Sequence, residues 1–334
     1  MTVYPTVRSR RVTVFGGSGF VGRHTIAALA ARGYMIRNAC RNPNLAVHLQ
    51  QLGVLGQIQS VAANVRVPWS VERAVVDADV AVNLVGILAE SGKQSFEAVQ
   101  AGGAETIARA CAERGIPLVH VSAIGADARS QSVYARTKAR AEDAVLRHVP
   151  DAVVMRPSIV FGPEDDFFNR FAAMSRIAPA LPLVGGGRTR FQPVYVRDVG
   201  EAVATAVAGE AKPGTTYELG GPRVMTFREC LEEMLEATYR SKPFIPIPFG
   251  VAGLMGRVMK YLPGTPLTDD QVTLLRRDNV VSRAAIDEGR TLEGLGIEPT
   301  ALEAILPSYM VQYRAEGQFT RKRAEIREEM MDDA

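Results

Sequence analysis

Cysteine is scarce in this 334-residue sequence, which contains only Cys40, Cys111 and Cys230. An odd number without CxxC spacing predicts neither a disulfide framework nor a zinc site, and it fits a reducing cytoplasm. The four histidines also lack the spacing of metal ligands. The acidic run Glu164–Asp166 is expected to start a helix, whose N-terminus favours carboxylates, rather than to bind a metal. We therefore expect no metal.

Long hydrophobic runs are also missing. The longest, Val80–Ala89, has 10 residues, about half of the roughly 20 that a membrane-spanning helix needs. We therefore expect no transmembrane segment. The first 11 residues hold three arginines but no apolar stretch, so no signal peptide is expected and a bacterial-type cytoplasmic protein is favoured.

The sequence has little excess charge of either sign, since 39 basic and 36 acidic residues leave a formal net charge of +3. Basic residues are not interleaved with aromatic residues along any face that can be defined. Nucleic acid is therefore not an expected partner. A hydrophobic content of 47% with 22% charged residues is typical of a globular protein rather than a disordered one.

What the sequence does have is a regular alternation of short β-branched runs and amphipathic stretches in its first half. The expected strands are Arg11–Phe15, Tyr34–Ala39, Gln57–Ala62, Val80–Val85, Leu118–Val121 and Ala152–Met155. The expected helices between them include Val21–Ala31, Ser95–Arg114 and Ser132–His148. This alternation predicts an α/β fold with a Rossmann-like, doubly wound parallel sheet.

Proline and glycine become frequent after Met155, and the alternation stops there. A strand that leads into a helix returns at Gln192–Ala208, with Asp198 as its expected cap. We expect a sheet domain from residues 10–160 plus 191–210, and a smaller, mainly helical second lobe from 161–190 plus 211–318. Residues 319–334 form a charged C-terminal tail.

An apolar, proline-bounded segment in the second lobe, Phe244–Pro266, predicts a helix in its middle, with Arg257 and Lys260 on one side. Two alternatives stay open for this helix. It packs on its own lobe, or it faces a membrane surface or a partner.

The stretch FGGSGFVG at Phe15–Gly22 places Gly16, Gly19 and Gly22 three residues apart, between the first strand and the first helix. Such a turn needs glycine where the backbone approaches a pyrophosphate, and the helix N-terminus then offers N–H groups to it. Tight turns also use glycine for purely steric reasons. The position in the first βα unit favours a dinucleotide site.

The second strand is followed by Arg41, and no Asp or Glu occurs between Tyr34 and Gln51. An acidic residue near this strand end holds the ribose 2′-hydroxyl of NAD, whereas an arginine accommodates the 2′-phosphate of NADP. A guanidinium group can hold phosphate oxygens in a bidentate manner. Arg41 therefore favours NADP(H), the alternative being a solvated loop residue.

Tyr134 and Lys138 are spaced i and i+4, on one face of the helix after the fifth strand. A nearby ammonium group would stabilise the phenolate of a catalytic tyrosine, and it could equally hold the nicotinamide ribose. Ser122 lies twelve residues before Tyr134. These three residues are the candidate catalytic group.

Together these motifs resemble those of the short-chain dehydrogenases/reductases, in their extended and atypical branch. FGGSGFVG is similar to the TGxxGxxG turn, YARTK to YxxxK, and MRPSIVFGP to the RPxxvyGp element, over residues 11–225. The resemblance implies cofactor contacts at Gly16, Ser18, Gly19, Phe20, Val21, Gly22, Arg41, Asn64, Leu84, Val85, Gly86, Ser122, Tyr134, Lys138, Pro157 and Ile159.

The resemblance also implies a catalytic hydroxyl beside Tyr134. Extended members often have two hydroxyl residues after the fifth strand, of which the second is catalytic, and here the pair is Ser122–Ala123. That alignment puts Ala123 in the catalytic position, whereas the twelve-residue spacing of shorter members puts Ser122 there. Both alignments stay open.

A closer resemblance comes from VNLVGIL, HVSAIGAD, FGPEDDFFNRF and PLTDDQVTLLRRDNVV, the last at Pro266–Val281. These segments are similar to the bacterial relatives of the nucleotide-binding accessory subunit of respiratory complex I, NADH:quinone oxidoreductase. The resemblance implies NADP(H) as a structural cofactor, other subunits of the peripheral arm as partners, and a peripheral place on the cytoplasmic side of the inner membrane. The alternatives are a free NADPH-dependent reductase or epimerase, and a regulator that senses NADPH occupancy.

Overall fold

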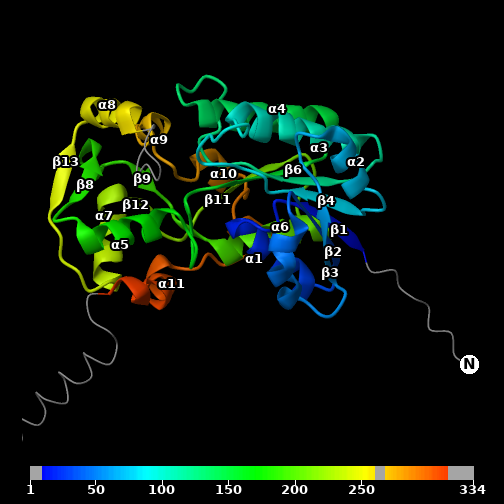
Figure 1. Cartoon of the computed structure of the whole chain (residues 1–334), viewed down its shortest axis with the longest axis horizontal. Coiled ribbons are helices and arrows are strands. Elements are labelled where there is room, and N and C mark those ends of the chain that lie inside the picture. Colours follow the sequence, from blue (N-terminus) through cyan, green and yellow to red (C-terminus); the bar gives the residue numbers. More distant parts are fainter. Residues whose placement is uncertain (1–9, 260–267, 315–334) are drawn as a thin grey trace, which may run out of the picture. The chain divides into compact units, whose positions relative to one another are not determined.

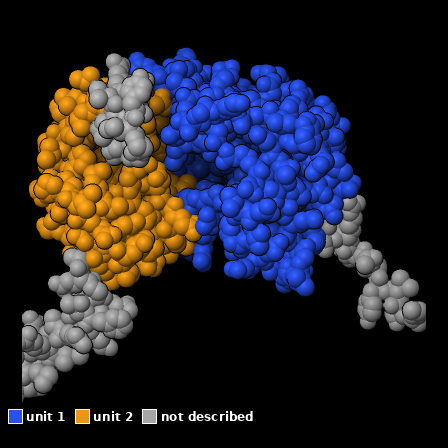
Figure 2. Space-filling model, in the orientation of Figure 1, with its two compact units in different colours: residues 1–158, 196–220, 280–299 blue, residues 159–195, 221–279, 300–334 orange. Residues whose placement is uncertain are grey.

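The computed structural model describes residues 10–259 and 268–314, and within these the chain forms two compact units. Unit 1 comprises residues 1–158, 196–220 and 280–299, and unit 2 comprises 159–195, 221–279 and 300–334 (Figure 2). Lys260 and the expected charged tail lie outside the described residues. Among the described residues, no helix has both the length and the apolarity to span a membrane.

A seven-stranded sheet forms the centre of unit 1, in the order β11-β6-β5-β4-β1-β2-β3 (Figure 1). All of its neighbouring strands pair in parallel. The order reverses between β1 and β4, which confirms the doubly wound fold. The strands are β1 (Arg11–Phe15), β2 (Met35–Cys40), β3 (Ile58–Ala62), β4 (Val80–Asn83), β5 (Leu118–Val121), β6 (Val153–Pro157) and β11 (Thr216–Leu219).

Helices cover both faces of this sheet, as Figure 1 shows. On one face lie α2 (Pro68–Ala74), α3 (Gly102–Ala112), which continues the short π-helix η2 (Glu97–Ala101), and α4 (Val133–His148). On the other face, α1 (Phe20–Ala31) packs against α6 (Val196–Ala208). The 3₁₀ helix η1 (Pro43–Leu52) follows β2, and α10 (Arg283–Asp287) and η4 (Glu293–Leu295) complete the unit.

The second face is tight because α1 and α6 approach at backbone distance. A Cβ atom added at Gly200 would lie 3.0 Å from the backbone carbonyl carbon of His24. Opposite, Ile107, Val71 and Val145 are fully buried in the core beneath α2, α3 and α4. Apolar side chains on both faces explain why hydrophobic residues predominate in the central strands β1, β4, β5 and β6.

Four segments differ from the expected division of the chain, and two of them, residues 159–160 and 191–195, belong to unit 2 although they were expected in the sheet domain. Residues 211–220 and 280–299 pack with unit 1, although the proline and glycine pattern placed them in the second lobe. The reason is that β11 pairs with β6 and completes the sheet, while Arg290 donates to the carbonyl oxygen of Thr216 at 2.7 Å. Asp198 lies within the first turn of α6, not before it, because the helix already begins at Val196.

Unit 2 contains short strand pairs and helices around a cluster of phenylalanines. The pairs are β7 (Val160–Phe161) with β10 (Val194–Tyr195), β9 (Arg190–Phe191) with β12 (Met225–Thr226), and β8 (Leu181–Val184) with β13 (Phe244–Ile247). The helices are α5 (Phe167–Ile177), η3 (Gly185–Gly187), α7 (Phe227–Ala237), α8 (Phe249–Met259), α9 (Asp269–Leu274), α11 (Leu302–Tyr309) and η5 (Met310–Tyr313). Phe167 stacks edge-on against Phe168 and Phe171.

The acidic run before α5 has a structural role. Asp165 is 3% exposed, and its carboxylate accepts hydrogen bonds from the N–H of Phe168 at 2.6 Å and the hydroxyl of Tyr309 at 2.7 Å. It thus caps the start of α5 and ties α11 to it. Burial raises the pKa of Asp165, although these hydrogen bonds oppose the shift. No metal-binding group of three or more His, Cys, Asp or Glu residues occurs in the described part of the chain.

Candidate functional site

The glycine turn joins β1 to α1, and two of its glycines are required by the protein itself. Gly16 has a φ of +83°, and an added Cβ atom would lie 3.0 Å from the carbonyl carbon of Leu84. A Cβ atom at Gly22 would lie 2.2 Å from the carbonyl oxygen of Gly16. Both positions therefore exclude a side chain on internal steric grounds.

Gly19 differs from these two glycines. Its backbone is extended, with φ −79° and ψ 177°, a conformation that any residue adopts. An added Cβ atom would meet only the carbonyl oxygen of Gly16, at 3.3 Å. Packing therefore requires glycine less strictly here than at Gly16 and Gly22, and the absence of a side chain leaves the approach to the start of α1 open.

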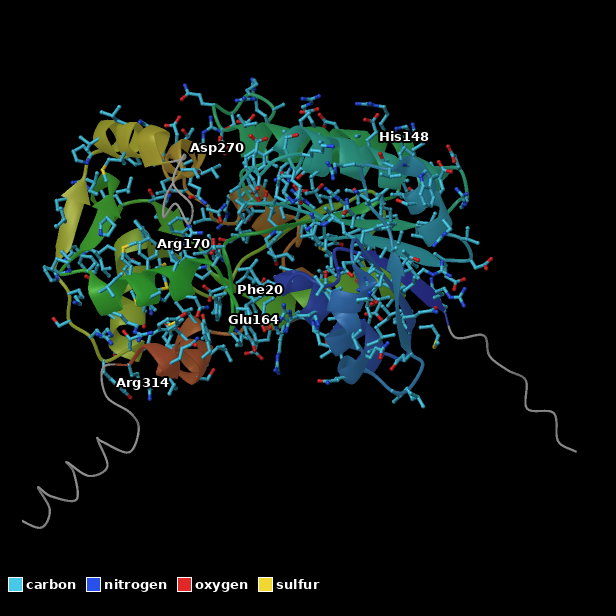
Figure 3. All side chains as sticks on the ribbon, viewed as in Figure 1. Phe20, His148, Glu164, Arg170, Asp270 and Arg314 are labelled. Carbon is cyan, nitrogen blue, oxygen red and sulfur yellow. The ribbon has the colours of Figure 1, made fainter. Side chains whose placement is uncertain are left out.

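The N-terminus of α1 has the properties of an anion site. Gly19 is the residue before the helix and offers no side-chain cap, and the first turn contains no acidic residue. Phe20 begins the helix (Figure 3), with its ring 6.0 Å from that of His24. Ser18 and Val21 flank it and are half-buried. An open, uncapped helix N-terminus after a parallel strand fits a pyrophosphate group.

The end of β4 lies beside the glycine turn. The N–H of Leu84 donates to the carbonyl oxygen of Phe15 at 2.9 Å, and the N–H of Val85 donates to the side chain of Asn83 at 3.0 Å. A Cβ atom at Gly86 would lie 3.4 Å from the amine of Lys138. The structure thus brings the ends of β1 and β4 and the lysine of α4 together, although they are far apart in the sequence.

Arg41 directly follows β2 and is exposed. Its Nη1 donates to Oε1 of Gln94 at 2.6 Å. Asn64, two residues beyond β3, accepts from the N–H of Arg66 at 3.1 Å, so its side chain stabilises the turn there. Arg41 and Asn64 both lie at the carboxyl ends of their strands, the edge where ligands bind in parallel sheets.

Tyr134 and Lys138 lie in the first turns of α4, which Ser132 caps by accepting from the N–H of Ala135 at 3.2 Å. The Lys138 amine is 5.9 Å from the centre of the Tyr134 ring. Burial lowers the pKa of Lys138 to about 8, and the neighbouring Glu142 carboxylate opposes this shift. The ring of Tyr134 packs edge-on against that of Phe96, with 5.8 Å between centres.

Ser122 directly follows β5 and is 4% exposed. Its N–H donates to the carbonyl oxygen of Met155 at 2.7 Å, whereas its Oγ is buried and has no hydrogen-bond partner among the described residues. Ala123, the next residue, is only half-buried. Ala123 is therefore the more exposed residue of the pair, and it has no hydroxyl group.

The remaining candidates, Pro157 and Ile159, lie on either side of the point in the sequence where unit 1 ends and unit 2 begins. Pro157 ends β6, and its carbonyl oxygen accepts from the N–H of Ile124 at 3.0 Å. Ile159 is the first residue of unit 2. The sequence interpretation did not single out Arg66, whose Nη1 donates to the carbonyl oxygen of Lys93 at 2.8 Å. The signal in the sequence that could have identified Arg66 is its position two residues after Asn64.

Comparisons with known proteins identify the family of this chain and structures with a similar fold. The model of a family described as the NAD dependent epimerase/dehydratase family matches residues 12–220. A solved structure of dTDP-glucose 4,6-dehydratase from Bacillus anthracis, in complex with NAD, superposes with a TM-score of 0.67 at 19% identity, over 91% of this chain and 96% of that one. At this identity the likeness concerns the fold alone.

Several curated relatives match over most of the chain, and two of them illustrate the likeness. One, from Arabidopsis thaliana, is named NADH dehydrogenase (ubiquinone) 1 alpha subcomplex subunit 9, mitochondrial, and is 34% identical over 91% of this chain and 78% of its own length. The other, from Neurospora crassa, is named NADH-ubiquinone oxidoreductase 40 kDa subunit, mitochondrial, and is 29% identical over 92% of this chain and 80% of its own. Both matches extend beyond residue 220 into the second lobe's share of the sequence.

Proposed function

Because the chain belongs to the NAD dependent epimerase/dehydratase family, we propose that it is an NADP(H)-binding accessory or assembly subunit of respiratory complex I, in which the nucleotide is structural and not turned over. The names of the relatives that match it at 34% and 29% identity support the complex I assignment. Bound nucleotide would supply hydride chemistry where a substrate exists. The residues of this chain bind and orient it.

One observation carries the nucleotide part of the proposal, the open approach at Gly19. The protein's own packing requires glycine at positions 16 and 22, whereas at 19 a Cβ atom would meet a single atom, the carbonyl oxygen of Gly16 at 3.3 Å. A pyrophosphate that approaches the start of α1 requires that space. The Lys138 amine beside Gly86 is suited to hold the nicotinamide ribose, and Asn64 is suited to contact the adenine end.

Arg41 supports NADP(H) over NAD(H). Its guanidinium group is exposed at the end of β2, and its hydrogen-bond partner there is a neutral amide, Gln94. A carboxylate at this strand end would repel a 2′-phosphate, whereas arginine attracts it. We assign the 2′-phosphate contact to Arg41.

The buried hydroxyl of Ser122 supports a structural nucleotide rather than a reactive one. A catalytic hydroxyl must reach the substrate oxygen within hydrogen-bond distance. The Ser122 Oγ is inaccessible to solvent, and the more exposed Ala123 has no hydroxyl to donate. Tyr134 and Lys138 then serve to bind the nucleotide.

The expected partners are other subunits of the complex I peripheral arm, near the arm's junction with the membrane. The subunit would therefore be peripheral to the membrane, on the side where that arm stands. We place it on the cytoplasmic side of the inner membrane, as in a bacterial complex.

Gentle solubilisation of membranes tests this function directly. The protein is expected in the same particle as the NADH:quinone oxidoreductase core, with near-stoichiometric NADP(H) that neither exchanges nor oxidises. Its absence from that particle, under conditions that preserve the holoenzyme, would refute the assignment. The nucleotide is identified by mass spectrometry of the denatured particle.

The second candidate is a free NADPH-dependent reductase or epimerase, favoured by the 5.9 Å separation between Lys138 and the Tyr134 ring. In that case Tyr134 protonates a carbonyl oxygen as hydride arrives, and Lys138 stabilises the phenolate. Turnover of any member of a carbonyl panel by the purified protein, lost in Tyr134→Phe, would establish this candidate. The matched control is Tyr34→Phe, directly before β2.

A further inference from the structure

A turn in the loop between β4 and α3 is held by two arginines that follow other strands of the sheet, β2 and β3. Ser91 and Gln94 pair through their backbones, the N–H of each donating to the other's carbonyl oxygen at 3.1 and 2.9 Å. Arg41, after β2, donates to Oε1 of Gln94 at 2.6 Å. Arg66, after β3, donates to the carbonyl oxygen of Lys93 at 2.8 Å. Neighbouring residues of one turn thus hold both guanidinium groups.

Within the part of the chain that the structure describes, Arg41, Arg66 and Lys93 have no counter-ion. Among the described residues, no carboxylate lies within ion-pair distance of Arg41, Arg66 or Lys93. Glu90, the acidic residue of the same loop, accepts instead from the N–H of Phe96 at 2.7 Å. Lys93 is exposed, and its ammonium group makes no hydrogen bond to a described residue. Two guanidinium groups are thus held by neighbouring residues of one turn, so an anion bound there would stabilise this arrangement.

We propose that Arg66 and Lys93, together with Arg41, bind the 2′-phosphate of NADP(H), and that the phosphate displaces Gln94 from Arg41. This inference rests on the proposed nucleotide site. It adds two specificity-determining residues and a competing side chain to it. The turn carrying Lys93 and Gln94 then responds to the 2′-phosphate, not to the dinucleotide in general.

The chemistry of the groups favours this exchange. A phosphate group has three oxygens and can accept from two guanidinium groups and an ammonium group at once. The amide oxygen of Gln94 is neutral, and hydrogen bonds from arginine to a charged oxygen are stronger than those to an amide. Releasing Gln94 exposes a polar side chain that is already partly exposed, so the exchange costs little.

The test compares 2′,5′-ADP with 5′-AMP, which differ only in the 2′-phosphate, by calorimetry on the full-length protein freed of nucleotide. Arg66→Gln is expected to weaken the binding of 2′,5′-ADP about tenfold. Lys93→Gln is expected to weaken it about threefold, because Lys93 is exposed to solvent. Binding of 5′-AMP should stay unchanged in both. The matched control, Arg147→Gln, removes the same charge in the last turn of α4, beside His148 (Figure 3), and should affect neither ligand.

Gln94→Ala tests the exchange. It frees Arg41 and is expected to tighten 2′,5′-ADP about twofold to threefold, because the energy of the lost hydrogen bond no longer opposes binding. Unchanged or weaker binding would overturn the exchange with Gln94. Arg66→Lys keeps the charge and should retain most of the preference, which provides a readout if Arg66→Gln fails to fold.

The outcomes separate this inference from the proposed function. If Arg66→Gln weakens both ligands equally or neither, Arg66 only positions the turn and the inference is overturned. The nucleotide assignment stands in that case if the wild type prefers 2′,5′-ADP and binds NADPH. If the wild type binds neither NADPH nor 2′,5′-ADP, the proposed function itself has failed.

Discussion

The side-chain amine of Lys138 donates a hydrogen bond of 3.3 Å to the carbonyl oxygen of Val121, the last residue of β5. The lysine is 5% exposed, so α4 holds a nearly buried cation against the end of the central sheet. Burial lowers its pKa from 10.5 to about 8. Burial of the charged Lys138 amine therefore lowers the stability of the folded protein, as expected where a charge serves to bind a ligand.

The first prediction concerns the alkaline stability of the nucleotide-free protein. Between about pH 8 and 10.5 the unfolded chain keeps the Lys138 proton and the folded chain loses it, so stability rises with pH in this window. Across this pH window, the free energy of unfolding of the wild type should rise by on the order of 3 kcal/mol relative to that of Lys138→Met. Urea unfolding at several pH values measures the difference, and parallel curves for the two proteins would contradict it.

The second prediction concerns acid. Burial lowers the pKa of His120 from 6.5 to about 3, with a smaller contribution from the Lys138 charge. Between these pH values the unfolded chain binds the extra proton, so stability falls as pH decreases. His120→Gln should flatten this dependence by up to about 1.4 kcal/mol per pH unit. Urea unfolding at several pH values between about 3 and 6.5 measures the slope, and equal slopes in the wild type and His120→Gln would contradict the prediction.

The third prediction tests the assignment of Arg41. Arg41→Asp replaces a charge-assisted phosphate contact with a repulsive charge, so NADPH affinity should fall at least about tenfold. NADH lacks the 2′-phosphate and should bind nearly as before. Fluorescence titration with both nucleotides measures the two constants. Equal losses for NADPH and NADH would refute the assignment.

The fourth prediction separates binding from packing within the glycine turn. Gly19→Val places a side chain in the open approach to α1 and should abolish nucleotide binding while the fold persists, since its Cβ meets one atom at 3.3 Å. Gly22→Ala is the contrasting variant, because its Cβ would lie 2.2 Å from a backbone oxygen and should lower the melting temperature. Unchanged nucleotide occupancy in Gly19→Val would count against the proposed role of the turn.

Local patterns predicted most of the sheet. The strand at Leu118–Val121 is confirmed residue for residue, and the strand at Arg11–Phe15 likewise. Both are short β-branched runs buried on both faces, a pattern that the sequence displays directly. The strand β11 was harder to assign to the sheet, because its neighbour β6 lies some sixty residues earlier in the sequence and no local signal specifies a pairing partner.

By itself the sequence determined the doubly wound fold, the family resemblance and the residues of the nucleotide motifs, since each depends on spacing within a short segment. The tertiary structure decided which glycine of the turn is left open, that the Ser122 hydroxyl is buried, and that Arg66 and Lys93 lie at the same turn as Arg41. These relationships join the ends of different strands. They follow from how the sheet brings those ends together, and no spacing along the chain records them.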